Sequence, residues 1–381
     1  MKQKQPRELL SAERKRAGLS YDGILSSVFA IVLGLIVGLI ILFLCNPAQA
    51  LPGFATILTG AFTHGAKGIG QVFYYATPII LTGLSVGFAF KTGLFNIGTP
   101  GQFIMGGFGA VYVGILWTSL GPAHWFVALL ASVVMGAVWG LVPGLLKAYY
   151  NVNEVIASIM MNYIGMYLVN WIVKSSKPLF NNLRNESRNV AATANIPKMG
   201  LDKIFPGSSV NGGIIIAIIV VILIYLLLNK TTFGYELKAL GFNRDASKYA
   251  GINEKKSIIM SMMIAGAIAG LAGGLLYLAG TGKHIEIKDV LASEGFTGIS
   301  VALLGLSNPI GVLFSGIFIA YLTAGGFYLQ LFEFSTEIID IIVAVIIYFS
   351  AFALMVKMLI GKVQKARHEK EEAQTKGGGD A

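Results

Sequence analysis

Apolar residues gather in runs of about 20 along almost the whole chain, with short polar interruptions between the runs. A helix of that length crosses the hydrocarbon core of a lipid bilayer. The pattern predicts ten transmembrane helices, of which the eighth is short. Their expected bounds are residues 24–45, 73–90, 102–119, 125–147, 155–173, 212–228, 257–279, 296–306, 310–329 and 337–358.

Composition agrees with this pattern and excludes a soluble globular protein. The chain has 381 residues, of which 55% are hydrophobic and 13% are charged, and its mean hydropathy is +0.71. Soluble domains contain far more charge. We expect an all-α, polytopic membrane protein with one transmembrane domain at 24–360, a basic tail at 1–23 and a disordered tail at 361–381.

Lysine and arginine are concentrated near the two ends, with six in residues 2–16 and six in residues 357–376. This distribution is typical of cytoplasmic flanks beside anionic lipid, and it does not indicate a nucleic-acid site. An even number of spans then predicts that both termini are cytoplasmic. The connection 230–255 also falls inside and is basic, whereas the external connection 174–210 is net positive, against the rule.

Two short motifs recur in the second half of the chain. TGLSV at 82–86 returns as TGISV at 297–301, and GLFN at 93–96 returns as GLSN at 305–308. In each half, an apolar segment leads into a polar break that contains glycine or proline. We therefore expect discontinuous helices and an internal two-fold repeat, with chance similarity in a glycine-rich chain as the alternative.

The stretch GLFNIGTPGQFIMGGFGA, residues 93–110, combines six glycines with Pro100, Asn96 and Gln102. A broken helix exposes backbone N–H and C=O groups, which are tolerated at membrane depth only against protein or water. The amides suit a neutral polar solute, so the stretch predicts a permeation pathway. Tight helix packing through the glycines at 106, 107 and 109 is the alternative.

A second polar cluster begins the fifth predicted span. Glu154, Ser158 and Asn162 follow one another at intervals of four residues, which gives them one face of a helix. Such a face is turned toward the bundle interior or a channel. We expect Asn162 to lie in the pathway and Glu154 to cap the span at the cytoplasmic edge.

The connection 231–252 predicts two short amphipathic helices on the cytoplasmic face. Gly241 and Gly251 stand near their expected C-termini, and Asn243 or Asp245 is expected to cap the second helix. Small side chains flanked by charges suit a groove on a partner protein better than a membrane anchor. An interfacial loop on lipid headgroups is the alternative.

No motif indicates catalysis in this chain. It has no GxxxxGK[ST] phosphate loop, no HExxH sequence and a single cysteine. We expect neither enzymatic activity nor a metal site, so energy for transport must come from elsewhere.

Three motifs resemble one family. GLFNIGTPGQ at 93–102, NEVIASIMMNYI at 153–164 and GYELKALGFNRDASKYAGI at 234–252 are similar to permease subunits of bacterial ABC importers. The group takes up ribose, branched-chain amino acids and nucleosides, and the resemblance is greatest to nucleoside permeases. In that family an acidic residue commonly precedes the GQ pair, where this chain has Thr99 and Pro100, which leaves the exact solute open.

The resemblance implies a plasma-membrane permease that imports a small polar solute, most of all a nucleoside, by alternating access. It implies three partners: an ATP-binding subunit that uses the ATP, a second homologous permease, and an extracellular substrate-binding lipoprotein. A sugar permease, for ribose as an example, and a secondary transporter or facilitator are the alternative functions.

The expected functional residues form three groups. A nucleoside calls for aromatic side chains that stack on the base and amides that form hydrogen bonds with it. The pathway residues are Phe95, Asn96, Gln102, Asn162, Tyr163 and Asn308. The residues expected to couple to the ATP-binding subunit are Glu236, Lys238, Ala239, Gly241, Asn243, Asp245 and Gly251. The binding lipoprotein is expected to dock at Arg184 and Arg188.

Overall fold

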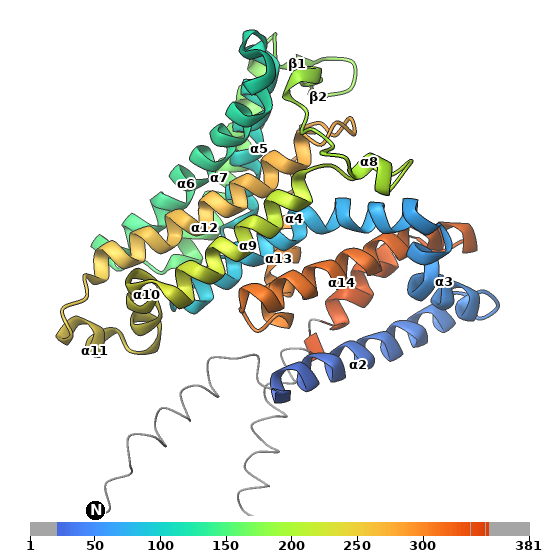
Figure 1. The fold of residues 1–381 in the computed structure, drawn as a ribbon, viewed down its shortest axis with the longest axis horizontal. Coiled ribbons are helices and arrows are strands. Elements are labelled where there is room, and N and C mark those ends of the chain that lie inside the picture. Colours follow the sequence, from blue (N-terminus) through green and yellow to red (C-terminus); the bar gives the residue numbers. More distant parts are fainter. Residues whose placement is uncertain (1–20, 336, 347, 350–381) are drawn as a thin grey trace, which may run out of the picture. The chain divides into compact units, whose positions relative to one another are not determined.

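The computed structural model describes residues 21–335, 337–346 and 348–349, with side chains from residue 28 onward. Within these residues, contacts form two compact units, one of residues 21–51 with 337–346 and 348–349, and the other of residues 52–335. The described residues are mainly helical and contain only two short strands, which confirms the all-α prediction (Figure 1). The domain bounds predicted from the sequence, and the tail at 361–381, stay predictions.

The longer helices follow the predicted order. They are α2 (Tyr21–Cys45), α3 (Ala50–Thr63), α4 (Gly65–Lys91), α5 (Thr99–Leu116), α6 (His124–Tyr150), α7 (Glu154–Ser175), α9 (Gly213–Lys230), α12 (Glu254–Tyr277), α13 (Ser293–Leu304) and α14 (Pro309–Phe327). Seven of the described helices are long and apolar enough to cross a membrane. The eighth predicted span corresponds to α13, which is short as expected, and the tenth continues beyond the described residues.

Residues 46–72, which the hydrophobic pattern left without a span, contain a helix and the start of another. Helix α3 has 14 residues, and α4 begins at Gly65, eight residues before the predicted bound. Glycines, prolines and Lys67 lower the hydropathy of this stretch below that of a span, although they do not prevent helix formation. A helix of this length is too short to cross a bilayer.

The smaller unit packs α2 against the helical residues 337–346. Gly34 and Gly38 of α2 lie against Ile346 and Ile342, and a side chain at either glycine would collide with these isoleucines. Close approach through small residues is the usual way in which membrane helices associate, because lipid removes the hydrophobic driving force between them.

Helices α5, α6 and α12 pack most closely with one another in the larger unit. Gly136 and Gly140 of α6 lie directly against the backbone of Gly266 and Gly270 of α12, and Gly106 of α5 also meets Gly270. The packing interpretation of the glycines after the break is therefore confirmed for Gly106. These contacts hold three helices at backbone distance and make a rigid frame.

The two sequence repeats lie side by side. Helix α13 packs along the second half of α4, where Gly298 meets Thr82 and Gly83 meets Val301. Each helix then ends in a turn that leads to a helix with proline in its first turn, Pro100 in α5 and Pro309 in α14. The recurrence in sequence thus has a counterpart in local structure.

The two ends of the larger unit differ in structure (Figure 1). One end carries the paired strands β1 (Phe180–Asn181) and β2 (Glu186–Ser187) and the short helix α8 (Leu201–Ile204). The other end carries α10 (Thr232–Phe242) and α11 (Arg244–Tyr249), which confirms the prediction of two short helices at 231–252.

Candidate functional site

The break between α4 and α5 is a tight turn at residues 92–98. Gly93 has φ of +76°, a conformation that favours glycine, and it lets the chain reverse after Lys91. Helix α5 then starts at Thr99, with Pro100 in the position where a missing N–H removes no helical hydrogen bond. The sequence therefore ends one helix and starts the next within a few residues.

Asn96 and Gln102 face each other across this turn, and both are buried. The Asn96 Nδ2 donates to Gln102 Oε1 at 2.8 Å, and the Gln102 Nε2 donates to Asn96 Oδ1 at 3.1 Å. Asn96 Oδ1 also accepts from the Gly98 N–H at 3.2 Å. The hydrogen bonds between these two side-chain amides stabilise the turn.

Asn162 binds the same turn from α7. Its Oδ1 accepts from the Gly101 N–H at 2.8 Å, and its Nδ2 donates to the Ile97 carbonyl at 3.0 Å. An unpaired backbone group in a dry interior costs about 1–3 kcal/mol, so this side chain stabilises the break. Ser158, one turn earlier on α7, is fully buried beside Gly98, and its hydroxyl has no partner among the described residues.

A polar cavity of about 320 Å³ lies near the end of the unit that carries the strands. It is enclosed by α5, α7, α12, the start of α13 and the connection between α12 and α13. The lining residues are Ile104, Met166, Asn170, Leu276, Tyr277, Lys283, His284, Glu286, Lys288, Val290, Leu291, Ala292, Ser293 and Glu294.

Charges in this cavity balance. Two lysines and two glutamates line it, and Lys288 Nζ lies 2.8 Å from Glu286 Oε2. The hydrogen bond from Lys288 lowers the pKa of the Glu286 carboxyl below its ordinary value, so this group is ionised at neutral pH. Asn170 Nδ2 donates to the Lys288 carbonyl at 3.1 Å and fixes the connection on α7. A charge-balanced cavity suits a neutral solute.

The start of α13 connects the cavity to the start of α5. Gly295, one residue after Glu294, packs directly against Pro100, and a side chain at 295 would overlap the proline backbone. The Tyr277 ring lies over Gly107 of α5, where any side chain would collide with it. The first turn of α13, which lines the cavity through Ser293 and Glu294, therefore rests on the first turn of α5.

The opposite side of the break contacts α10. A side chain at Gly241 would lie 2.8 Å from the Gly93 nitrogen and 2.9 Å from the Thr92 carbonyl carbon, so the two backbones touch. Leu240 and Leu94 share a buried cluster with Ile258 and Met262 of α12. Cavity, break and α10 form one continuous series of contacts.

Comparison with known proteins gives the family. Residues 68–351 match the model of the branched-chain amino acid transport system permease component. The chain belongs to this family of ABC importer permeases. It is 36% identical to the guanosine ABC transporter permease protein NupP of Bacillus subtilis, over 90% of this chain and 97% of NupP. It is 34% identical to the nucleoside ABC transporter permease protein NupB of Lactococcus lactis, over 93% of this chain and 97% of NupB.

Two weaker matches bear on partners and solute. Bacillus subtilis has a second guanosine permease, NupQ, which is 27% identical over 65% of this chain and 77% of NupQ. The glucose ABC transporter permease protein TsgB13 of Haloferax volcanii is 29% identical over 78% of each chain. No solved structure matches significantly. The permease is thus a multi-pass membrane protein, and paired permeases occur among its relatives.

The six predicted pathway residues of the permease do not form one group. Asn96, Gln102 and Asn162 meet at the break, as described above. Phe95 stacks on Phe90 with ring centroids 4.8 Å apart, Tyr163 is 47% exposed, and Asn308 caps α14 by accepting from the Ile310 N–H. None of the six lines the polar cavity, so their role in the pathway stays a prediction.

Sequence reasoning missed the cavity residues Asn170, Tyr277 and Glu294. They lie on three different helices or helix ends, far apart in the chain, and each reads as an ordinary residue near the end of a span. One signal was present for Glu294, because a carboxylate immediately before a short span is unusual at membrane depth. Only the packing of α5, α7, α12 and α13 brings the three together.

Asn243 follows its prediction, whereas the residue that caps α7 is Asn153 and not Glu154, because the Asn153 side chain accepts from the Val155 and Ile156 N–H groups. Asn243 Oδ1 accepts from the Ala246 N–H at 3.0 Å and caps α11, whereas Asp245 lies in the first turn. Glu154 starts α7 and pairs with Lys147 at 2.9 Å. Gly251, with φ of +82°, follows α11. Gly241 lies inside α10, one residue before its end, where it permits the contact with Gly93 instead of ending the helix.

The remaining predicted residues are on the surface. Lys238 donates to Asn229, and Glu236 and Ala239 are half-buried on α10. At the other end, Arg188 Nε donates to the Phe180 carbonyl at 3.1 Å, and Arg184 lies 3.8 Å from Glu186. Arg184 therefore keeps most of its surface free for a partner.

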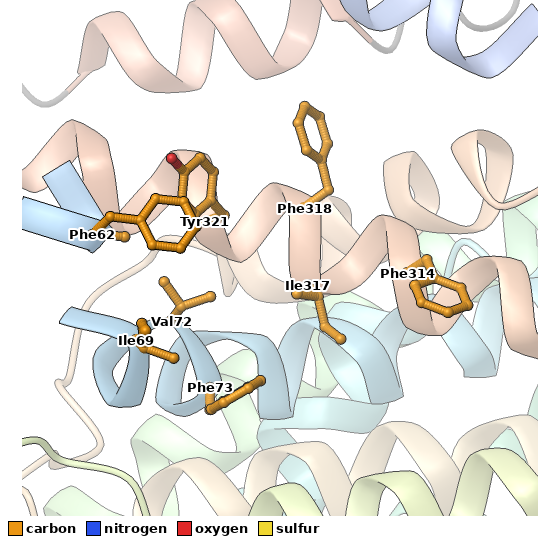
Figure 2. Close-up of a pocket in the computed structure, with 9 residues that line it drawn as sticks. Phe62, Ile69, Val72, Phe73, Phe314, Ile317, Phe318 and Tyr321 are labelled. Atoms are coloured by element: carbon orange, nitrogen blue, oxygen red, sulfur yellow. The ribbon is translucent and has the colours of Figure 1, made fainter. Parts of the chain in front are cut away.

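A second cavity of the permease, of about 470 Å³, is apolar. Figure 2 shows its side chains, which come from α3, α4 and α14 and include Phe62, Phe73, Phe314, Phe318 and Tyr321. The Tyr321 hydroxyl donates to the Leu58 carbonyl, so this polar group already has a hydrogen-bond partner. The cavity suits hydrocarbon and is a poor site for a polar solute.

Proposed function

We propose that this permease is one of two membrane subunits of an ATP-driven importer that takes up nucleosides across the bacterial plasma membrane. The observation that carries the proposal is a charge-balanced cavity at the start of α13, in a chain that matches guanosine and nucleoside permeases over 97% of their length. A nucleoside is neutral and joins an aromatic base to a polar sugar, which suits a cavity with Tyr277 and Asn170. The chain does no chemistry on the solute.

The break is the inner gate in this proposal. Solute enters the cavity from outside and is stopped by the first turn of α13, where Gly295 packs against Pro100. When the break separates from α7, the amides of Asn96, Gln102 and Asn162 lose their backbone partners and become available to the passing solute. Phe95, Tyr163 and Asn308 are expected further along this route.

Helices α10 and α11 dock on a separate ATP-binding subunit, which hydrolyses the ATP. Tyr235, Phe242 and Tyr249 support this assignment, because their side chains are 70%, 90% and 95% exposed. Exposed aromatic residues are common anchors of protein interfaces. Since Gly241 touches Gly93, a shift of α10 acts directly on the break and changes the populations of outward-open and inward-open states.

A second homologous permease covers the exposed face of α7. Exposed residues of α9 are aliphatic, as expected beside lipid, whereas the middle of α7 exposes the hydroxyl-bearing rings of Tyr163 and Tyr167. Hydrocarbon offers no partner for these hydroxyls. NupP and NupQ, two guanosine permeases of one bacterium, support a heterodimer.

The extracellular side receives the binding lipoprotein at the connection that contains Arg184 and Arg188. An acidic patch on that protein would complement this basic surface. The termini and α10 then lie in the cytoplasm, in agreement with the positive-inside rule.

Uptake of labelled solutes tests the function. Cells that lack the gene are compared with cells that carry it, using guanosine, adenosine, uridine, ribose and leucine at equal concentration. We expect the gene to restore accumulation of nucleosides only. Restoration of ribose or leucine uptake alone would contradict the assignment of nucleosides as the solute.

A second arm identifies the energy source. Depletion of ATP at constant membrane potential should abolish uptake, and an uncoupler at constant ATP should leave uptake unchanged. The opposite result would indicate a secondary transporter.

A further inference from the structure

We propose that Glu294 reads the base of the solute and selects guanosine over adenosine. The inference rests on the proposed function and goes beyond it, because it names one residue of the cavity as the determinant of specificity. It follows from the pairing of the charges in the cavity and from the hydrogen-bonding edges of the two purines.

Glu294 is the cavity carboxylate that remains available. Within the described part of the chain it forms no ion pair, and its nearest polar contact is the neighbouring Ser293 hydroxyl at 3.4 Å. The other cavity carboxylate, Glu286, is held by Lys288 at 2.8 Å. Glu294 lies in the first turn of α13, where the free N–H groups of a helix start favour a carboxylate.

The position of Glu294 is well defined. The next residue, Gly295, packs against the backbone of Pro100, which fixes the start of α13 on α5. The Tyr277 ring, in the same lining, is fixed in turn by Gly107 and lies 6.4 Å from the Phe103 ring. A carboxylate and an aromatic side chain on rigid supports are what recognition of a flat, polar base requires.

Guanine and adenine differ at the edge that such a carboxylate would meet. Guanine presents two neighbouring donors, N1–H and the N2 amino group, and a carboxylate accepts both with its two oxygens. Adenine presents a donor, the N6 amino group, beside an acceptor, N1. A carboxylate pairs with the first and repels the second, so it rejects adenine by leaving a polar group unpaired.

The substitution Glu294→Gln removes the carboxylate that gives this preference. A glutamine amide accepts from N6–H and donates to N1 of adenine, whereas it offers only one acceptor to guanine. We expect the ratio of guanosine to adenosine uptake to fall by about tenfold or more in this variant. Glu294→Asp keeps the carboxylate and should keep the guanosine preference at a lower rate.

The experiment measures initial rates in cells that carry the complete importer, with equal guanosine and adenosine. All strains share the same partner proteins, so a change in the ratio belongs to position 294. Glu333→Gln, the same chemical change at an exposed residue after α14 and outside the cavity, is the matched control and should leave the ratio unchanged.

The outcomes separate the two proposals. If wild-type cells take up no nucleoside, the proposed function fails and Glu294 has no base to read. If they take up guanosine, and Glu294→Gln preserves the wild-type ratio, the inference about Glu294 is overturned while the function stands. A wild-type importer with equal rates for both purines also overturns it. Should the glutamine variant not accumulate in membranes, Glu294→Asp decides, because loss of guanosine preference with the carboxylate retained contradicts base reading.

Discussion

At the scale of single residues, the buried amides of this permease bind its own backbone. Asn162 satisfies one carbonyl and one N–H of the break, and the pair formed by Asn96 and Gln102 satisfies a third group, the Gly98 N–H. Broken helices need such partners, since hydrocarbon supplies none. A polar residue at membrane depth thus has a structural task in this conformation, and contact with solute requires the break to move.

Asn162→Ala should destabilise the protein. The change leaves the Ile97 carbonyl and the Gly101 N–H buried and unpaired, at about 1–3 kcal/mol for each group. We expect a lower Tm of the purified permease in detergent and reduced uptake. Tyr163→Ala, at the neighbouring exposed position, should change the Tm little, and equal Tm values for the two variants would contradict the structural role of Asn162.

At the scale of elements, two short helices make the contacts on which the cavity and the break depend. Helix α13 has only 12 residues, yet it closes the cavity at one end and packs along α4. Helix α10 has 11 residues, and it reaches the break through a glycine contact. Hydropathy detects long apolar segments, so it does not single out either of these short helices.

Gly241→Ala should weaken transport. The new methyl group would lie 2.8 to 3.0 Å from the backbone of Lys91, Thr92 and Gly93, and α10 must shift away from the break. Overpacking of this kind costs about 1–3 kcal/mol. We expect a lower uptake rate at normal expression, with ATP hydrolysis by the complex retained.

The control for this substitution is Gly87→Ala, another glycine of the same region. Its added methyl group would lie 3.4 Å from its nearest neighbour, an ordinary contact. If the two alanine variants transport equally well, the contact between α10 and the break does not couple the ATP-binding subunit to transport.

At the scale of the whole molecule, the larger unit has a strand-bearing end with the cavity and a helical end with α10 and α11 (Figure 1). The proposed topology puts the first end outside the cell and the second inside. Cys45 is the only cysteine, which makes selective labelling possible in a Cys45→Ser background.

Single cysteines test this topology. Leu183, between β1 and β2, is 96% exposed, and Tyr249 in α11 is 95% exposed. We expect Leu183→Cys to react with a membrane-impermeant maleimide in intact cells, and Tyr249→Cys to react only after permeabilisation. The reverse pattern would invert the topology and would separate α10 from a cytoplasmic ATP-binding subunit.

Much of the fold could be predicted from the sequence because it follows from local properties. The apolar runs predicted nine helices of the described chain, and Asn243 predicted the start of α11. The break was visible as Pro100 among glycines and amides. These signals are short-range, since helix formation in a membrane depends on which residues stand next to one another.

The cavity could not be predicted in the same way. Asn170, Tyr277 and Glu294 are more than 100 residues apart at the extremes and share no motif. Residues 46–72 were also missed, because their helices have mixed composition. Glycine content suggested close packing but did not identify which helices would meet.

By itself, the sequence determined that this is an α-helical membrane permease with interrupted spans and a short paired-helix segment at 231–252. Tertiary structure alone decided what the polar groups do: three amides hold the break, and a carboxylate in the first turn of α13 lines a cavity. The physical reason is distance. Hydropathy and helix capping act between neighbours in the chain, whereas a hydrogen bond or a cavity wall depends on which distant segments pack together.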